Sequence, residues 1–185
     1  LNSKMQLRLW NDLNKLLDDL KNKIINGEKV IAPFPLLPLI NDPKLLRKNT
    51  EVFINQMHPR NQILPLIESY KIRKKIRIGY FSADFRIHPV TTLTAELYEV
   101  HNRDHFEIHA FSFGPDTKDE MNLRVKAGVD HFHNVRSMSH QEITILARSF
   151  EIDIAVDLAG FTADSAINVF AMSAAPIQLS YIGYL

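Results

Sequence analysis

The chain has 185 residues, of which 45% are hydrophobic, enough for one domain of ordinary size with a core and an appended segment. Its 22 Lys and Arg residues nearly balance 21 Asp and Glu, and no basic run is long enough to follow a phosphate backbone, so nucleic acid is not an expected partner. The longest apolar stretch, 31–40, is interrupted by prolines and is too short for the helix of roughly 20 residues that crosses a bilayer, so no membrane association is expected.

The sequence contains no cysteine and no recognisable secretory leader. Both absences fit a cytoplasmic location, which we expect for this protein. Because the first residue is Leu rather than Met, we interpret the chain as a piece of a longer protein.

Residues 1–75 are predicted to form a helical and Pro-rich linker segment. A first helix that stops at Gly27 is expected where apolar residues recur at spacings of three and four, namely Trp10, Leu13, Leu17, Leu20 and Ile24. Residues 32–38 are expected to be an extended arm, because proline cannot continue a helix. The pair Asp42-Pro43 predicts the start of a second helix. A basic connector at 71–75 marks the expected boundary.

Short apolar strands alternate with helices from residue 76 onward. Strands are predicted at 76–81, 106–113, 131–135, 152–158 and 177–182, and helices at 91–100, 120–127, 140–150 and 164–172. This alternation is typical of an α/β fold, and we predict a Rossmann-like parallel sheet at 76–185 with helices on both faces. Right-handed crossovers then bring three loops, 82–90, 114–119 and 160–164, to the carboxyl edge of the sheet, where such folds bind ligands.

The loop after the first strand contains two groups that can transfer protons. Asp84 and His88 lie four residues apart, just before an expected helix N-terminus. A carboxylate orients a neighbouring imidazole and stabilises its charged form, and such a pair suits removal of the proton from an attacking hydroxyl. The next helix opens with Thr91 and Thr92, where backbone N–H groups favour a phosphate or carboxylate. In the structural alternative, Asp84 binds loop amides and His88 only packs.

The loop after the fourth strand is the second candidate for ligand binding. Gly160 permits a ligand to approach the backbone closely, Thr162 offers a hydroxyl, and the backbone N–H groups suit a sugar or diphosphate. In the structural alternative, Gly160 supplies a positive φ at a turn that Asp157 caps. The glycine patterns of dinucleotide and P-loop sites are absent, so neither class of site is expected.

Two further groups of residues contain side chains found in metal or hydrolase sites. His131 and His133 flank one residue of a short strand, so both imidazoles point to one face, but no third ligand follows at a recognisable spacing and we predict no metal site. Ser82 precedes Asp84 and His88 as in a serine hydrolase, but the Gly-x-Ser-x-Gly motif of a nucleophile elbow is absent.

Four ordered segments resemble the catalytic region of O-GlcNAc transferases and their SPINDLY-like bacterial relatives. The first is the segment IGYFSADFRIHPV at 78–90, and the others lie at 123–126, 152–162 and 175–184. The helical segment before them resembles the linker that joins the family's tetratricopeptide helices to the catalytic region, through Trp10, Asp12, Leu13, Pro33, Phe34 and Pro35. The resemblance covers nearly the whole chain.

The resemblance implies a GT-B architecture, of which this chain is the first of two facing lobes. It implies inverting, metal-independent transfer of GlcNAc from UDP-GlcNAc to Ser or Thr hydroxyls of a protein, with no cofactor. Asp84 and His88 then fall beside the sugar and acceptor as catalytic residues, and the wall on the donor side is formed by Gly160, Phe161, Thr162, Ile182 and Gly183. The implied partners are a protein or peptide acceptor, the UDP-sugar, a second lobe and tetratricopeptide repeats, so the chain alone is expected to be inactive.

The sequence departs from the family pattern at two places. It ends at Leu185, where the family continues with Pro-Gly-Thr, and Pro33-Phe34-Pro35 stands where animal members carry a linker histidine, so the catalytic base is not assigned from that position. Two alternatives therefore stay open. One is a non-enzymatic α/β module that binds a partner through its first helix and Pro-rich arm, and the other is a different GT-B enzyme, such as a nucleotide-sugar epimerase.

Overall fold

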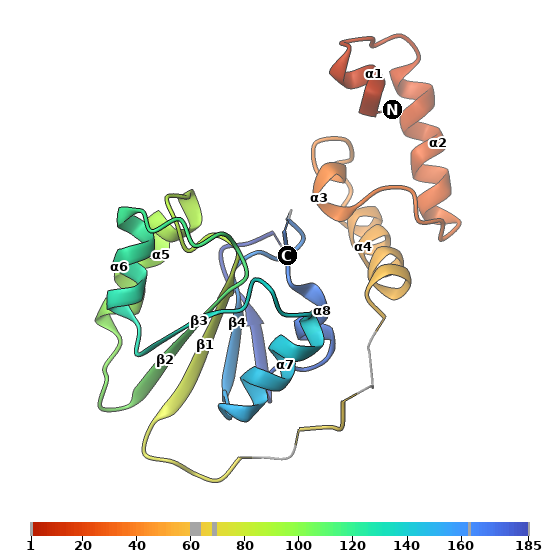
Figure 1. Cartoon of the computed structure of the whole chain (residues 1–185). Helices are drawn as coiled ribbons and strands as arrows, with labels where there is room; N and C mark the ends of the chain where they lie inside the picture. Colours follow the sequence, from red (N-terminus) through yellow and green to blue (C-terminus); the bar gives the residue numbers. More distant parts are fainter. Residues whose placement is uncertain (1, 60–63, 68–69, 163, 185) are drawn as a thin grey trace. The chain divides into compact units, whose positions relative to one another are not determined.

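A computed structural model describes residues 2–59, 64–67, 70–162 and 164–184 of the chain. The chain divides into two compact units, Leu1–Pro59 and Arg60–Leu185, and Figure 1 labels most of their helices and strands. The assignment of residues 1–75 to a linker and of 76–185 to a catalytic lobe stays a prediction. Within the described ranges, no helix has the length and apolar character needed to cross a bilayer.

The first unit is helical, with α1 (Asn2–Gln6), α2 (Leu13–Ile25), α3 (Pro33–Leu36) and α4 (Pro43–Met57). Its core contains Leu20, Ile24, Leu36 and Ile40. Both expected long helices are confirmed. Gly27 follows α2 with a φ of +77°. The Asp42 carboxylate caps α4 by accepting from the first free backbone N–H groups of that helix.

Two details of the first unit correct the expectations. The extended arm is wrong, because Pro33–Leu36 forms the short helix α3. Prolines are tolerated in a first turn, where the N–H groups have no acceptor inside the helix, and the burial of Leu36 holds the turn in place. The placement of Trp10 on the first helix is also wrong, because α2 begins only at Leu13 and Trp10 is 54% exposed.

The second unit is an α/β sheet unit with five parallel strands in the order β3-β2-β1-β4-β5. The strands are β1 (Ile76–Ser82), β2 (Phe106–Ser112), β3 (His131–Asn134), β4 (Ile154–Asp157) and β5 (Ile177–Ser180). They alternate with the helices α5 (Pro89–Val100), α6 (Glu120–Gly128), α7 (His140–Ser149) and α8 (Ile167–Ala171). The predicted fold class and every predicted strand and helix of this part are confirmed, with ends that shift by a few residues.

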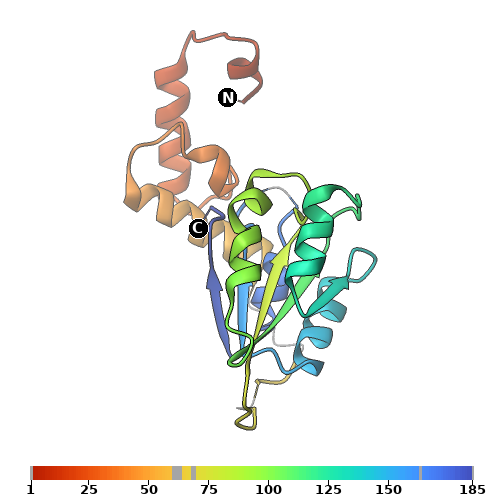
Figure 2. The same cartoon turned by 90° about the vertical axis from the view of Figure 1, so that its left-hand side faces the viewer.

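Apolar side chains fill the space on both faces of the sheet. One cluster contains Tyr80, Tyr98, Ile108 and Val125, and lies under α5 and α6. The other contains Phe81, Phe111, Ile143 and Val169, and lies under α7 and α8. Figures 1 and 2 show these helix pairs on opposite faces of the strands. Burial of each large apolar side chain stabilises the unit by about 1.5–3 kcal/mol.

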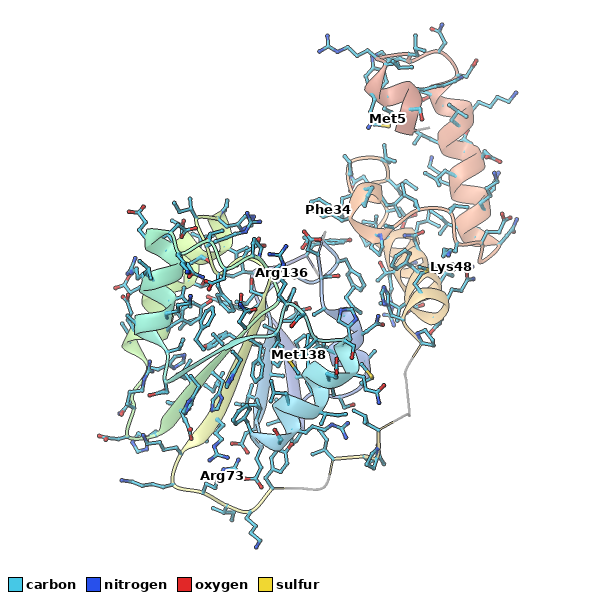
Figure 3. All side chains as sticks on the ribbon, viewed as in Figure 1. Met5, Phe34, Lys48, Arg73, Arg136 and Met138 are labelled. Atoms are coloured by element: carbon cyan, nitrogen blue, oxygen red, sulfur yellow. The ribbon has the colours of Figure 1, made fainter. Side chains whose placement is uncertain are left out.

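Arg73 attaches the segment before β1 to the amino ends of the strands (Figure 3). Its Nη1 donates to Glu151 Oε2 over 2.7 Å and its Nη2 to Asp153 Oδ1 over 2.7 Å. Asp153 lies in the turn just before β4, so these bonds connect the entry to β1 with the entry to β4. They support the register in which Ile78 pairs with Ile154.

Candidate active site

The strand order places a ligand-binding position at the carboxyl ends of β1 and β4. From β1, the chain adds β2 and β3 on one side and then returns to add β4 and β5 on the other. Open α/β sheets bind ligands outside the carboxyl ends of the strands at such a reversal. The two loops chosen from the sequence, after β1 and after β4, are the loops that flank it.

The structure brings Asp84 and His88 together in the first of these loops. Asp84 Oδ2 lies 3.6 Å from His88 Nδ1, and Asp84 Oδ1 accepts a 2.9 Å hydrogen bond from Arg86 Nη2. The side chains of Asp84 and His88 are 20% and 35% exposed. Both groups are thus held by the protein and still open to a ligand.

His88 is also the N-cap of α5. Its Nδ1 accepts a 3.3 Å hydrogen bond from the N–H of Val90 and therefore carries a lone pair. In the neutral ring the proton then lies on Nε2, which acts as a hydrogen-bond donor. To accept a proton on Nε2, the ring must hold its other proton on Nδ1, facing the Asp84 carboxylate, and give up the cap.

Buried polar groups fix the shape of this loop. The Ser82 hydroxyl accepts from the N–H of Asp84 over 2.9 Å, and Asn122 Nδ2 donates to the Phe85 carbonyl over 2.7 Å. Ser82 is 1% exposed, so its hydroxyl cannot meet a substrate and a serine hydrolase is not supported. At the other end of the loop, the Asp119 carboxylate accepts from the N–H of Ile87.

The loop after β4 contacts the chain's own last residues. Gly160 has a φ of +59°, and a Cβ on it would lie 1.8 Å from the carbonyl oxygen of Tyr184. The N–H of Phe161 donates to that same oxygen over 2.8 Å. A Cβ on Gly183 would lie 2.5 Å from the carbonyl carbon of Ala159. The structure thus brings residues 159–161 and 183–184 side by side.

The free amides expected in this loop are already occupied. Asp157 accepts from the N–H groups of Ala159 (2.9 Å) and Gly160 (3.1 Å), and Thr162 donates its hydroxyl to the Ala159 carbonyl over 2.9 Å. Burial raises the pKa of Asp157, although its bonds from the two amides oppose the rise. The capping role weighed for Asp157 and the positive φ of Gly160 are both present. The backbone of Tyr184 therefore occupies the space beside Gly160 that a ligand would otherwise use.

Ile182 has an unusual backbone conformation beside this wall. Its φ is +69°, which a β-branched residue rarely adopts, and it is 40% exposed. Such strain costs of order 1–3 kcal/mol and is concentrated at ligand-binding sites. Ile182, which only the resemblance singles out, is thus both strained and partly exposed.

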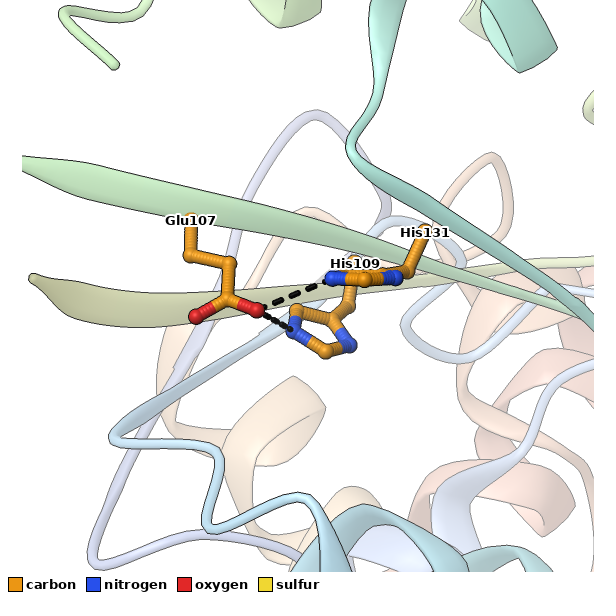
Figure 4. A group of neighbouring side chains, drawn as sticks. All are labelled: Glu107, His109 and His131. Carbon is orange, nitrogen blue, oxygen red and sulfur yellow. Dashed lines mark hydrogen bonds and ion pairs between the residues drawn. The ribbon is translucent and has the colours of Figure 1, made fainter.

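Sequence reasoning missed two groups of residues that the fold assembles. An open hollow at the end of β3 is lined by Asn134, Arg136 and Ser137, which form no motif in the sequence. At the opposite, amino edge of the sheet, Glu107, His109 and His131 form a group that could hold a metal ion (Figure 4). The spacing of residues after His133 does not reveal this group, because two of its three members lie on the preceding strand.

Comparison with known proteins decides the family. The profile of glycosyl transferase family 41 matches residues 54–185, which include both loops of the candidate site. The chain belongs to glycosyl transferase family 41. The resemblance inferred from four sequence segments is therefore confirmed.

Named relatives of family 41 agree with this assignment. The chain is 34% identical over 111 residues to the probable UDP-N-acetylglucosamine–peptide N-acetylglucosaminyltransferase SEC of Arabidopsis thaliana, covering 60% of this chain and 11% of that protein. It is 29% identical over 117 residues to the UDP-N-acetylglucosamine–peptide N-acetylglucosaminyltransferase of Caenorhabditis elegans, covering 60% of this chain and 10% of that protein. The chain thus spans about a tenth of the length of these relatives.

A solved structure of the family supports the fold. A variant of the O-GlcNAc transferase of Thermobaculum terrenum superposes with a TM-score of 0.58 at 31% identity, covering 60% of this chain and 21% of that one.

Proposed function

We propose that this chain is the first lobe of the catalytic region of a protein O-GlcNAc transferase. The observation that carries the proposal is the Asp84–His88 loop at the carboxyl end of β1, at the reversal of strand order, in a chain of family 41. The relatives are named for transfer of N-acetylglucosamine to peptides from a UDP-sugar. By analogy, UDP-GlcNAc is the donor and a Ser or Thr hydroxyl of a protein is the acceptor, with no metal in the reaction.

In the proposed reaction, the acceptor oxygen bonds to the anomeric carbon while the bond from that carbon to the phosphate oxygen breaks. The electron pair leaves with UDP, and attack from the opposite side inverts the anomeric configuration. His88 Nε2 takes the proton of the acceptor hydroxyl, with the proton on Nδ1 facing Asp84. Such general-base help is worth about 10²–10⁴-fold in rate.

The remaining acceleration requires a second lobe. The leaving diphosphate needs positive charge or N–H donors, which are among the largest contributions to catalysis. In the loop after β4, the amides of Gly160 and Phe161 already donate to the protein. We therefore expect the 185-residue chain alone to show no transfer, and measurable transfer by the pure chain would contradict this step of the proposal.

The experiment is transfer of radiolabelled sugar from UDP-GlcNAc to total cell protein by the full-length parent. Asp84→Asn keeps an oxygen for Arg86 but removes the charge, and His88→Asn keeps an N-cap acceptor for α5 but removes the imidazole. Each variant should lose about 10²-fold or more of the transfer rate.

The neighbouring exposed pair Asp104 and His105 provides matched controls. Asp104→Asn and His105→Asn make the same chemical changes away from the carboxyl edge and should leave the rate unchanged. Normal transfer by both variants would show that the loop with Asp84 and His88 has only a structural role. No transfer by the wild-type parent would contradict the proposed transfer from UDP-GlcNAc to protein.

A further inference from the structure

Three side chains that can bind a metal converge where β2 and β3 begin. Glu107 and His109 are two residues apart on β2, so they point to the same face, and His109 is paired in register with His131 on β3. Figure 4 shows the Glu107 carboxylate facing both imidazoles. This group lies at the amino edge of the sheet, opposite the edge that carries Asp84 and His88.

The distances suit a tetrahedral ion. Glu107 Oε1 lies 2.9 Å from His131 Nε2 and 3.5 Å from His109 Nε2, and all three ligand atoms lie within 4.8 Å of one another. With zinc–ligand bonds of about 2.0–2.1 Å, the ligands of a tetrahedral site stand roughly 3.3 Å apart. Small movements of the exposed His131 side chain are enough to complete this geometry.

The buried His109 has one ring nitrogen, Nε2, that is available to bind a metal ion. The side chain of His109 is 2% exposed, and its Nε2 makes no hydrogen bond to any residue that the structure describes. Its Nδ1 lies 3.0 Å from Nε2 of His133. If Nδ1 donates there, the lone pair of Nε2 faces the Glu107 carboxylate, and a cation between them replaces repulsion by two bonds.

Neighbouring side chains orient the ligands for metal binding. Arg77 Nε donates to Glu107 Oε2 over 2.9 Å, which leaves Oε1 for the shared position. His133 Nε2 lies next to His109 Nδ1, on the side of the ring opposite the shared position. His133 then acts on His109 as an outer-shell partner that fixes its ring.

We propose that Glu107, His109 and His131 bind a zinc-class divalent cation, with water as the fourth ligand. Two imidazoles and one carboxylate are ligands typical of zinc. The ion would join β3, a four-residue edge strand, to β2, and so stabilise the edge of the sheet. Its role is structural, and it is independent of the proposed transfer reaction at the other edge.

The test is zinc binding by the untagged chain after removal of metal by a chelator. Isothermal titration with ZnCl₂ and metal analysis after dialysis should give one equivalent per chain. Cobalt(II) should give the intense visible absorption of a tetrahedral site. Zinc should also raise the melting temperature, because it binds the folded state.

Three variants test the assignment of the ligands. His131→Gln and Glu107→Gln should each abolish the tight site and the rise in melting temperature. His133→Phe leaves all three ligands in place and should weaken binding about 10–100-fold, as expected for an outer-shell partner. The matched control His105→Gln removes an exposed histidine near the same edge and should bind as the wild type does.

Two results would overturn the proposal. One is a wild-type chain that binds no zinc at micromolar concentration. The other is a folded His131→Gln or Glu107→Gln variant, checked by circular dichroism, that binds as tightly as the wild type. Neither result bears on sugar transfer, which is measured with other variants.

Discussion

Replacement of Gly160 by Ala would place a methyl group 1.8 Å from the carbonyl oxygen of Tyr184. The φ of +59° at this position costs a non-glycine residue about 1–2 kcal/mol. Relief of the clash must also move Tyr184 away from the N–H of Phe161, which loses a hydrogen bond worth about 1 kcal/mol. The expected loss in the free energy of unfolding is therefore about 2–3 kcal/mol.

Two other glycines separate the contributions to this loss. Gly27 has a φ of +77° but no atom within 4 Å of its added Cβ, so Gly27→Ala tests backbone strain alone. Gly114→Ala tests steric overlap alone. The φ of Gly114 is not positive, and the added Cβ would lie 1.7 Å from the carbonyl oxygen of Ala83. Gly27 belongs to the first unit, whereas Gly114 and Gly160 belong to the sheet unit, so each variant is compared with the wild-type transition of its own unit.

Urea unfolding followed by circular dichroism measures these changes. The only tryptophan, Trp10, lies in the first unit, so its fluorescence follows the unfolding of that unit. With a denaturant slope of about 2 kcal/mol/M, Gly160→Ala should lower the midpoint of the sheet unit by roughly 1–1.5 M. A midpoint equal to that of the wild type would refute the claim that residues 160 and 184 are packed backbone to backbone.

Two further predictions concern His88 and Tyr80. His88→Ala should lower the stability of the sheet unit by about 1 kcal/mol, because the cap of α5 is lost, whereas His88→Asn should retain most of that stability. Urea midpoints measure the difference, and equal midpoints for the two variants would contradict the capping role. Burial raises the pKa of Tyr80 to about 12 from an ordinary value of about 10, so its contribution to stability is complete below pH 10 and is lost as the pH rises through 12. At pH 11 the loss in the free energy of unfolding is about 1.4 kcal/mol. Tyr80→Phe should therefore lose less stability than the wild type between pH 8 and 11, and parallel losses in the two proteins would contradict the raised pKa of Tyr80.

The sheet unit could be predicted almost completely from the sequence, because its signals are local. Alternation of apolar strands with amphipathic helices depends on near neighbours, and the loops at the carboxyl edge follow from the handedness of the crossovers. The first unit was predicted less well. Proline normally argues against a helix, but at Pro33 the burial of Leu36 favours a first turn, and no pattern in residues 32–38 reports that burial.

The proximity of Asp84 and His88 could be predicted from the sequence, but their hydrogen bonds could not. The proximity of Asp84 and His88 follows from their spacing before a helix. That His88 Nδ1 caps the helix depends on the rotamer of the ring, which the sequence does not determine. The group of Glu107, His109 and His131 depends on the register between β2 and β3, and register is a property of the assembled sheet.

The contact between Gly160 and Tyr184 limits how a nucleotide sugar can meet this wall. Glycines in such loops usually allow a ligand to approach the backbone, but here the nearby atoms belong to the chain itself. In the proposed reaction, a donor that binds here meets the side chains of this wall, unless the two segments separate on binding. Separation would expose the amide of Phe161, and the strained backbone of Ile182 lowers the cost of moving the second segment. If the wall separates, Gly160→Ala should weaken binding of the donor less than it destabilises the fold, because binding and the methyl group both displace Tyr184.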